Sequence, residues 1–283
     1  MTVPAETAPY PLTWLYAPGD RPRVVAGALA SGADVVIVDL EDAVAPDRKD
    51  YARAATAELL SAPEHPVPVH VRVNALGTPP AQRDLAALAA LPGLAALRLP
   101  KVTSADQVIH LAETTPPSAP GTTRLHALLE SALGIERAHA IASAHPALRG
   151  ISLGEADLRA DLGVRGDAGL DWCRSRVIVA ARAAGLPPPA QSIHPDIRDL
   201  EGLAASCAHG RALGFLGRAA IHPRQLPVIE RAYLPSEREV EQAETIVKAA
   251  ATGQGALALP DGRFVDAAVV AAARRTLSLA RRC

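Results

Sequence analysis

The chain has 283 residues, of which 49% are hydrophobic and 3% aromatic, so it can bury a sizeable core. Its 29 basic and 30 acidic residues give a formal net charge of −1, which excludes an overall field that would attract nucleic acid or an anionic membrane. Three widely spaced cysteines without a C-x-x-C pair favour neither a disulfide framework nor a zinc site. With no secretion signal or bilayer-spanning run in view, we expect a soluble cytoplasmic protein.

Two kinds of apolar stretch alternate along most of the chain. The first eleven residues are rich in proline and are expected to be flexible. Beyond them, short leucine-rich or β-branched runs alternate with alanine-rich stretches, which predicts strands alternating with helices. The predicted strands are 13–17, 34–40, 68–74, 94–100, 124–130, 149–154, 190–193 and 214–221.

Eight such units predict an α/β protein with a parallel sheet, and a (β/α)8 TIM barrel fits this length better than an open sheet. No glycine-rich dinucleotide fingerprint follows the first strand, so a Rossmann fold ranks second. Further helices are expected over 236–250 and 266–281, joined by a glycine-bearing link. We therefore divide the chain into a catalytic barrel over 1–235 and a C-terminal helical arm or lid over 236–283, which we expect to reach a neighbouring subunit.

Charged residues cluster where the predicted strands end, and in a barrel the carboxyl-terminal ends of the strands carry the chemistry. Glu130 and Asp157 follow the fifth and sixth strands, and two acids on one open face either repel each other or bind a cation. Their hard oxygen atoms suit Mg²⁺, while helix caps or surface salt bridges are the alternative reading. The other strand-end charges are Asp20, Arg21, Asp39, Glu41, Asp42, Arg72, Lys101 and Glu155.

Several motifs occur in the order seen in one known family. They are WLYAPGDRPR, VVIVDLEDAVAPD, VRVN, LPK, LLESALG, SLGEADLRADLG, DLEGL, LGFLGRAAIHPRQ and GRFVD. With them the chain resembles the citrate lyase β-subunit-like, malyl-CoA lyase-like branch of the HpcH/HpaI aldolase superfamily, from about Trp14 to Asp266. The resemblance implies a Mg²⁺-dependent (β/α)8 barrel, with Mn²⁺ as the alternative ion, in a homotrimer or homohexamer. It implies cleavage or formation of a carbon–carbon bond in a CoA thioester such as citryl-, malyl- or citramalyl-CoA.

The resemblance also implies roles for the strand-end charges. Glu130 and Asp157 match the metal ligands, and Glu130 is expected to contact substrate as well. Arg72 would steady an enolate or carboxylate oxygen, because a guanidinium donates in a planar, bidentate way and stays charged when desolvated. Asp39 and Glu41 would orient Arg72 or a metal-bound water, and a purely structural ion pair with Arg72 is compatible with this.

Three further features are expected around the site. Pro18, Gly19 and Arg21 match a P-G-x-R turn that would contact CoA, although simple turn chemistry also explains them. Lys101 would bind a CoA phosphate or a metal-site carboxylate, with a rim salt bridge as the alternative. Asp266 matches a catalytic aspartate supplied across a subunit interface, where it would move the proton at the thioester α-carbon; an N-cap for the last helix is the plainer reading.

The chain departs from the family pattern at a few positions. Asp42 stands where the free-acid aldolases of the superfamily have a histidine, which argues against that branch. Ala268 replaces a common proline, and Gln191 lies where an acidic residue is frequent. His222 matches the family, but a structural role is favoured over a base.

The predicted function is cleavage of a carboxylated 3-hydroxyacyl-CoA into an acyl-CoA and a 2-oxoacid. The alternatives are an aldolase acting on free 2-oxoacids and a non-catalytic acyl-CoA-binding subunit of a larger lyase complex. A thioesterase side activity is also open, since the same metal can activate water.

Overall fold

The structure is a computed structural model that describes residues 10–115, 124–252, 257–258, 262 and 264–281. Most of the expected flexible segment at the start, and most of the glycine-bearing link over 252–263, lie outside the described residues. Two compact units divide the chain, and the larger one runs from Pro11 to Glu230.

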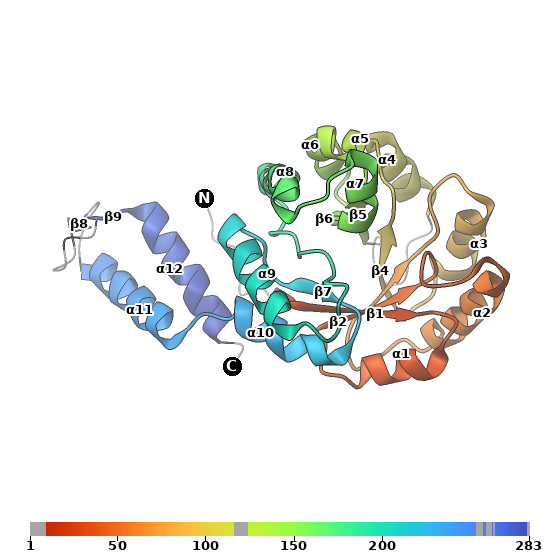
Figure 1. Ribbon diagram of the computed structural model, residues 1–283, viewed down its shortest axis with the longest axis horizontal. Helices are drawn as coiled ribbons and strands as arrows, with labels where there is room; N and C mark the ends of the chain where they lie inside the picture. Colours follow the sequence, from red (N-terminus) through yellow and green to blue (C-terminus); the bar gives the residue numbers. More distant parts are fainter. Residues whose placement is uncertain (1–9, 116–123, 253–256, 259–261, 263, 282–283) are drawn as a thin grey trace. The chain divides into compact units, whose positions relative to one another are not determined.

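The larger unit is built on a curled sheet of seven parallel strands, which confirms the predicted α/β class (Figure 1). The strand order in the sheet is β6-β5-β4-β3-β2-β1-β7. The strands are β1 (Thr13–Pro18), β2 (Val35–Asp39), β3 (Val69–Arg72), β4 (Leu94–Leu99), β5 (Leu125–Leu129), β6 (Leu148–Leu153) and β7 (Arg218–Ala220).

Helices connect the strands, as parallel pairing requires. Figure 1 shows the first three α-helices along the outer side of the curled sheet. The helices of this part are α1 (Pro22–Leu29), α2 (Lys49–Leu60), α3 (Pro79–Leu88), α4 (Ala105–Thr114), α5 (Ala132–Glu136), α6 (Ala138–Ala142), α7 (Glu155–Leu162), α8 (Asp171–Ala183), α9 (Leu200–Leu213) and α10 (Leu226–Tyr233), with 3₁₀ turns η1 (Pro46–Arg48), η2 (Asp167–Leu170) and η3 (Pro223–Gln225).

Burial on both faces explains the composition of the strands. All five residues of β2, with sequence VVIVD, are buried, and strands covered on both faces have near-continuous apolar sequences. The strands end in charged residues because their carboxyl ends open onto a cavity rather than onto the apolar core. The helix-covered core therefore fixes the strands, and the strand ends present the polar side chains together.

The predicted strand over 190–193 is reduced to a single bridge, and the described residues do not close the sheet into a full barrel. Gln191 pairs with Arg218 of β7, and the amide of Gln191 donates to the carbonyl of Gly217. Toward β6, the contact is made by a side chain, since the Glu155 amide donates to Ser192 Oγ over 3.3 Å. Three consecutive prolines precede this segment, and proline has no N–H to donate to a strand ladder.

The smaller unit contains the described residues from Arg231 onward. Its helices α11 (Glu237–Thr252) and α12 (Ala267–Ala280) pack against each other, and β8 (Leu257–Ala258) pairs antiparallel with β9 (Phe264–Val265). Asp266 caps α12, because its Oδ1 accepts hydrogen bonds from the amides of Ala268 and Val269, each 2.9 Å long.

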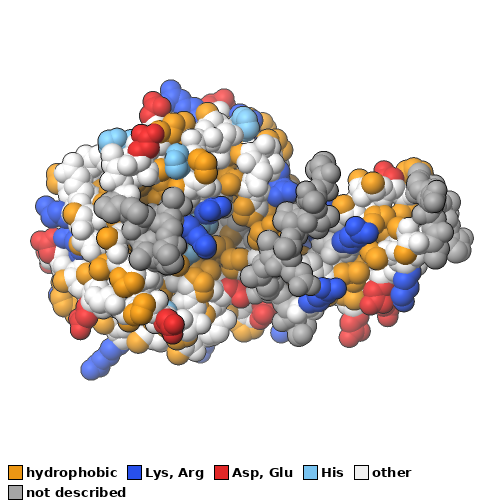
Figure 2. Space-filling model, turned by 180° about the vertical axis from the view of Figure 1, so that it is seen from behind, with side chains coloured by type: hydrophobic (Ala, Val, Ile, Leu, Met, Phe, Trp, Pro, Cys, Tyr) orange, Lys and Arg blue, Asp and Glu red, His pale blue; other side chains and the backbone are white. Residues whose placement is uncertain are grey.

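The described helices include none that is long and apolar enough to cross a membrane. Acidic and basic side chains are both scattered over the face drawn in Figure 2, as the near-zero net charge leads us to expect.

A buried carboxylate holds α2, α3 and β3 together. Asp84 of α3 has 0% exposure; its Oδ1 accepts from Arg53 Nε at 2.8 Å, and its Oδ2 accepts from the backbone amide and Nδ2 of Asn74 at 3.0 and 2.7 Å. All of these donors lie in the interior of the larger unit. Water could therefore not replace the carboxylate of Asp84 as their acceptor.

Replacing Asp84 by alanine should therefore lower the free energy of unfolding by about 3 kcal/mol, because it leaves the buried Nε of Arg53 and the buried amide groups of Asn74 without their acceptor, while Arg53 keeps only its contact with the exposed Asp50. Urea unfolding followed by circular dichroism measures this. Asp47→Ala, at an exposed aspartate, is the matched control and should change stability by less than about 0.5 kcal/mol. Equal losses in the two variants would contradict the role given to Asp84.

Candidate active site

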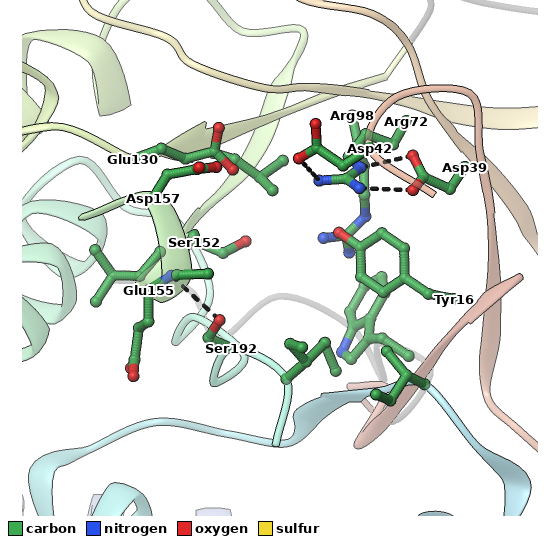
Figure 3. Close-up of a pocket in the computed structure, with 18 of the residues that line it drawn as sticks. Tyr16, Asp39, Asp42, Arg72, Arg98, Glu130, Ser152, Glu155, Asp157 and Ser192 are labelled. Carbon is green, nitrogen blue, oxygen red and sulfur yellow. Dashed lines mark hydrogen bonds and ion pairs between the residues drawn. The ribbon is translucent and has the colours of Figure 1, made fainter. Parts of the chain in front are cut away.

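A cavity of about 370 Å³ lies at the carboxyl ends of the strands in the larger unit. Its floor and walls combine aromatic and aliphatic side chains with a set of polar groups that converge on its centre (Figure 3). The labelled polar lining comprises Tyr16, Asp39, Asp42, Arg72, Arg98, Glu130, Ser152, Glu155, Asp157 and Ser192.

Arg72 is clamped by two acids from the end of β2. The register of β2 against β3 places Asp39 beside Arg72. Arg72 Nε and Nη2 donate to the two carboxylate oxygens of Asp39 at 2.7 and 2.6 Å, and the same oxygens accept the backbone amides of Glu41 and Ala43. This bidentate geometry fixes the plane of the guanidinium and holds the pKa of Arg72 far above its ordinary value despite the cost of burial.

Glu41 links Arg72 to the next part of the site. Its Oε1 accepts from Lys101 Nζ at 2.7 Å, and its Oε2 lies 3.0 Å from Arg72 Nη1 without the alignment of a hydrogen bond. Burial raises the pKa of Glu41, and these two cations oppose that effect. Lys101 has a φ of 55°, a left-handed conformation that non-glycine residues rarely adopt. In this conformation its backbone amide donates to Glu130 while its ammonium reaches Glu41.

Glu130 is buried at the end of β5 with one oxygen left for a ligand. Its Oε2 accepts the Lys101 amide at 2.9 Å. The neighbouring residue 154 is a glycine, and a Cβ at this position would collide with Glu130 Oε1. Burial raises the pKa of Glu130 to about 7, and the negative charges of Glu41 and Asp157 add to the rise. A cation at this position would relieve that repulsion.

Asp157 stands in the first turn of α7, and Figure 3 shows its carboxylate turned toward that of Glu130. The structure thus brings together the two acids that the sequence pairs. Glu155, two residues earlier, has a different role, because Arg174 Nε and Nη2 bind its two oxygens at 2.9 and 2.7 Å. In the described part of the chain, no group of three or more histidine, cysteine or acidic side chains is arranged to hold a metal.

Four polar residues of the cavity were not predicted from the sequence: Tyr16, Arg98, Ser152 and Ser192. Tyr16 of β1 and Arg98 of β4 both face the interior, and the Arg72 guanidinium lies 5.3 Å from the Tyr16 ring centre. The sequence could have predicted Arg98, because it is a charged residue inside the apolar run LAALRLP, just as Arg72 is a charged residue inside a predicted strand.

The other predicted residues lie away from this cavity or have local partners. Gly19 packs so closely on β2 that a Cβ would meet Leu40 Cδ2 at 2.7 Å, and Arg21 is exposed in the turn after β1. Pro18 ends β1. His222 is half-buried and its Nδ1 accepts the Arg224 amide, in line with a structural role.

Comparison with known proteins agrees with the geometry. The family model described as HpcH/HpaI aldolase/citrate lyase matches residues 12–223. The chain belongs to this family. It is 38% identical over 272 residues to a citrate lyase subunit beta-like protein of Mycobacterium tuberculosis, with 93% of each chain covered. It is 36% identical over 278 residues to a (3S)-malyl-CoA thioesterase of Cereibacter sphaeroides, covering 94% of this chain and 93% of that one.

A solved structure of the family is similar throughout. The M. tuberculosis protein CitE in complex with magnesium, acetoacetate and coenzyme A superposes with a TM-score of 0.81 at 38% identity, covering 96% of this chain and 98% of that chain. A second structure of the citrate lyase beta subunit from that organism, complexed with oxaloacetate and magnesium, has a TM-score of 0.68 at 38% identity and covers 80% of this chain and 97% of that one. The family resemblance drawn from the motifs is thereby confirmed.

The raised pKa of Glu130 predicts how stability depends on pH in metal-free protein. Folding raises this pKa from the ordinary 4.5 to about 7, so the folded state binds the proton more tightly than the unfolded state. The stabilisation from Glu130 is complete below about pH 4.5 and is lost as the pH rises to about 7, a change of roughly 3 kcal/mol. Urea unfolding in EDTA at pH 5 and pH 8 measures it. Glu130→Gln should gain stability relative to wild type at pH 8 only; a constant difference at both pH values contradicts the assignment.

Proposed function

We propose that the protein is a Mg²⁺-dependent carbon–carbon lyase that cleaves a carboxylated 3-hydroxyacyl-CoA into an acyl-CoA and a 2-oxoacid, or forms it from them. The observation that carries the proposal is the convergence of Glu130, Asp157 and the clamped Arg72 on one cavity in a chain of this family. Related structures with magnesium, coenzyme A and small oxoacids support it. We also propose that the curled sheet is part of a (β/α)8 barrel, the fold that the family resemblance implies.

The donor set fits magnesium. Glu130 and Asp157 offer two carboxylates, and Mg²⁺ is usually bound through one or two carboxylates, with water and substrate completing six oxygens. Glu130 keeps Oε1 beside the side-chain-free Gly154, while its other oxygen is held by the Lys101 amide. When bound there, the ion supplies Lewis acidity that polarises the oxygens of the 2-oxoacid half.

The protein itself supplies orientation and positive charge. Asp39 and Glu41 hold Arg72 so that Nη1 and Nη2 each retain an N–H for a substrate oxygen. In cleavage a base takes the proton of the β-hydroxyl, which becomes the carbonyl of the 2-oxoacid. The bond between the α- and β-carbons breaks with its electron pair passing to the α-carbon, and the resulting enolate must be stabilised until the α-carbon is protonated. A guanidinium fixed before the reaction stabilises that developing charge without reorganisation.

Asp266 is the proton donor we propose for the α-carbon in cleavage, and the base in condensation. Its Oδ1 is used by the N-cap of α12, which leaves Oδ2 for proton transfer. We propose a homotrimer or homohexamer in which this residue serves a neighbouring copy. Arg21, Gly19, Pro18 and Lys101 are proposed to lie on the path of the CoA moiety.

A thioesterase is the second candidate, because the Cereibacter sphaeroides relative is named for that activity and shares 36% identity over nearly the whole chain. The two functions differ in products. A lyase releases an acyl-CoA and a 2-oxoacid, whereas a thioesterase releases free CoA and an intact hydroxyacid.

The test is turnover of citryl-, malyl- and citramalyl-CoA by the isolated protein with Mg²⁺, with products separated by chromatography. We expect an acyl-CoA and a 2-oxoacid, and loss of activity in EDTA. Glu130→Gln should lower kcat/KM by more than about a hundredfold, since even indirect partners of a metal ligand are worth 10- to 100-fold. Asp47→Ala is the control. Free CoA and the intact hydroxyacid, without any acyl-CoA, would establish the thioesterase instead, and Mg²⁺-dependent turnover by Glu130→Gln would overturn the metal assignment.

Replacing Asp266 by asparagine separates the proton donor from the helix cap, because asparagine caps as well as aspartate does. We expect kcat to fall by about 10²- to 10⁴-fold with no change in thermal stability. Oligomers assembled from Asp266→Asn and Glu130→Gln chains should regain activity, since an intact pair of groups then forms between copies. Unchanged kcat in Asp266→Asn refutes the role, and the absence of recovery refutes its action on a neighbouring copy.

A further inference from the structure

The cavity contains a second arginine that the mechanism above does not use. Arg98 lies on β4, is 4% exposed and lines the cavity. Figure 3 shows its guanidinium pointing into the interior, beside the hydroxyl of Tyr16. Its charge is therefore buried, and it faces space that a ligand can enter.

Arg98 and Arg72 are adjacent in the register of β3 and β4, but their surroundings differ. Arg72 has Asp39 and Glu41 as partners. Arg98 forms no ion pair with any acid of the described residues, and its Nε has no hydrogen-bond acceptor. Its contacts are a hydrogen bond with Tyr16 and the Trp14 ring, whose centre lies 4.5 Å from the guanidinium carbon.

The strands on either side provide no negative charge for Arg98. Its neighbours in register are Arg72 on β3 and His126 on β5. Burial lowers the pKa of His126 and of the nearby His70 well below the ordinary value, so both rings are neutral. The buried indole N–H of Trp14 likewise has no acceptor among the described residues. The groups nearest Arg98 thus bring no negative charge to it.

A guanidinium keeps its charge in a protein interior, and an unpaired buried charge is destabilising. Such a group becomes favourable once an anion of matching shape reaches it, and a carboxylate matches the guanidinium fork. The ligand must come from the cavity, since the packed strands close the other directions.

We propose that Arg98 forms an anion subsite for a second carboxylate on the 2-oxoacid half of the substrate. This inference rests on the proposed function, in which Glu130 and Asp157 hold the metal that binds the other end of the same 2-oxoacid. The preferred product is then a 2-oxoacid that carries a further carboxylate, as oxaloacetate does, over one that carries only a methyl group, as pyruvate does. Arg98 determines specificity and takes no part in bond cleavage.

The test compares two ligands that share the metal-binding end and differ in the added carboxylate. Isothermal titration calorimetry with Mg²⁺ gives the Kd of fresh oxaloacetate and of pyruvate for each variant. In wild type we expect oxaloacetate to bind about 10- to 100-fold more tightly, the value of one charge-assisted pair. Arg98→Met should bring the two Kd values within about threefold while leaving the Kd of pyruvate unchanged.

Two further variants keep the test decisive. Arg218→Met changes an arginine that is equally buried, on β7, but outside the cavity, and it should keep the wild-type preference. Without ligand, Arg98→Met should unfold at a higher temperature than wild type, because it removes an unpaired buried charge and keeps an apolar side chain of similar length. Arg98→Lys retains the charge without the fork and should show an intermediate preference.

A wild-type ratio near one, or a ratio that persists in Arg98→Met, overturns the subsite. Equal loss of both ligands together with a lower unfolding temperature shows a purely structural arginine and overturns it as well. Because the ratio is measured without turnover, it is independent of the lyase assay. Failure of that assay with an intact ratio refutes the proposed reaction and leaves the subsite standing.

Discussion

The buried ion pair between Asp39 and Arg72 is the interaction on which the rest of the site depends. Both residues end their strands at the same level of the sheet, and the pair is bidentate. From it a continuous set of polar contacts crosses the sheet. Glu41 lies against Arg72, Lys101 binds Glu41, and the Lys101 amide binds Glu130. Removing one partner of a buried pair leaves an uncompensated charge, so a change at Asp39 would disturb the whole set.

The buried charged groups of this protein are of two kinds. In the described part of the chain, some have oppositely charged partners and belong to the scaffold, whereas others lack such partners and line the proposed ligand site. Arg174, Arg53 and Arg72 are each held by carboxylates in fixed geometry. Arg98 has no carboxylate partner among the described residues, and burial together with the negative charges of Glu41 and Asp157 raises the pKa of Glu130. Native interiors seldom leave polar groups unpaired. The unpaired cation and the repelled anion on the walls of one cavity are the observations behind the positions that we propose for an anionic ligand and a cation.

Membership in the family says more about the kind of site than about the reaction that takes place there. Relatives of nearly equal identity are named as citrate lyase subunits and as thioesterases. The metal ion that we propose for Glu130 and Asp157 can polarise an oxoacid or activate water, so the reaction depends on which groups surround it. In this protein the clamped Arg72 favours stabilisation of an enolate, and that is why we place carbon–carbon cleavage first.

The sequence by itself determined the strand–helix alternation, the family and the position of the polar residues at strand ends, because buried parallel strands and their open carboxyl ends leave a clear hydrophobic pattern. It also singled out Glu130, Asp157 and Arg72. Only the tertiary structure decided which charges meet. Among the described residues it paired Glu155 with Arg174 and joined Lys101 to Glu41, and it gave Arg98 no acidic partner. It also reduced the segment around Gln191 to one bridge. These outcomes depend on register between strands and on packing across the cavity, which one strand's own sequence does not encode.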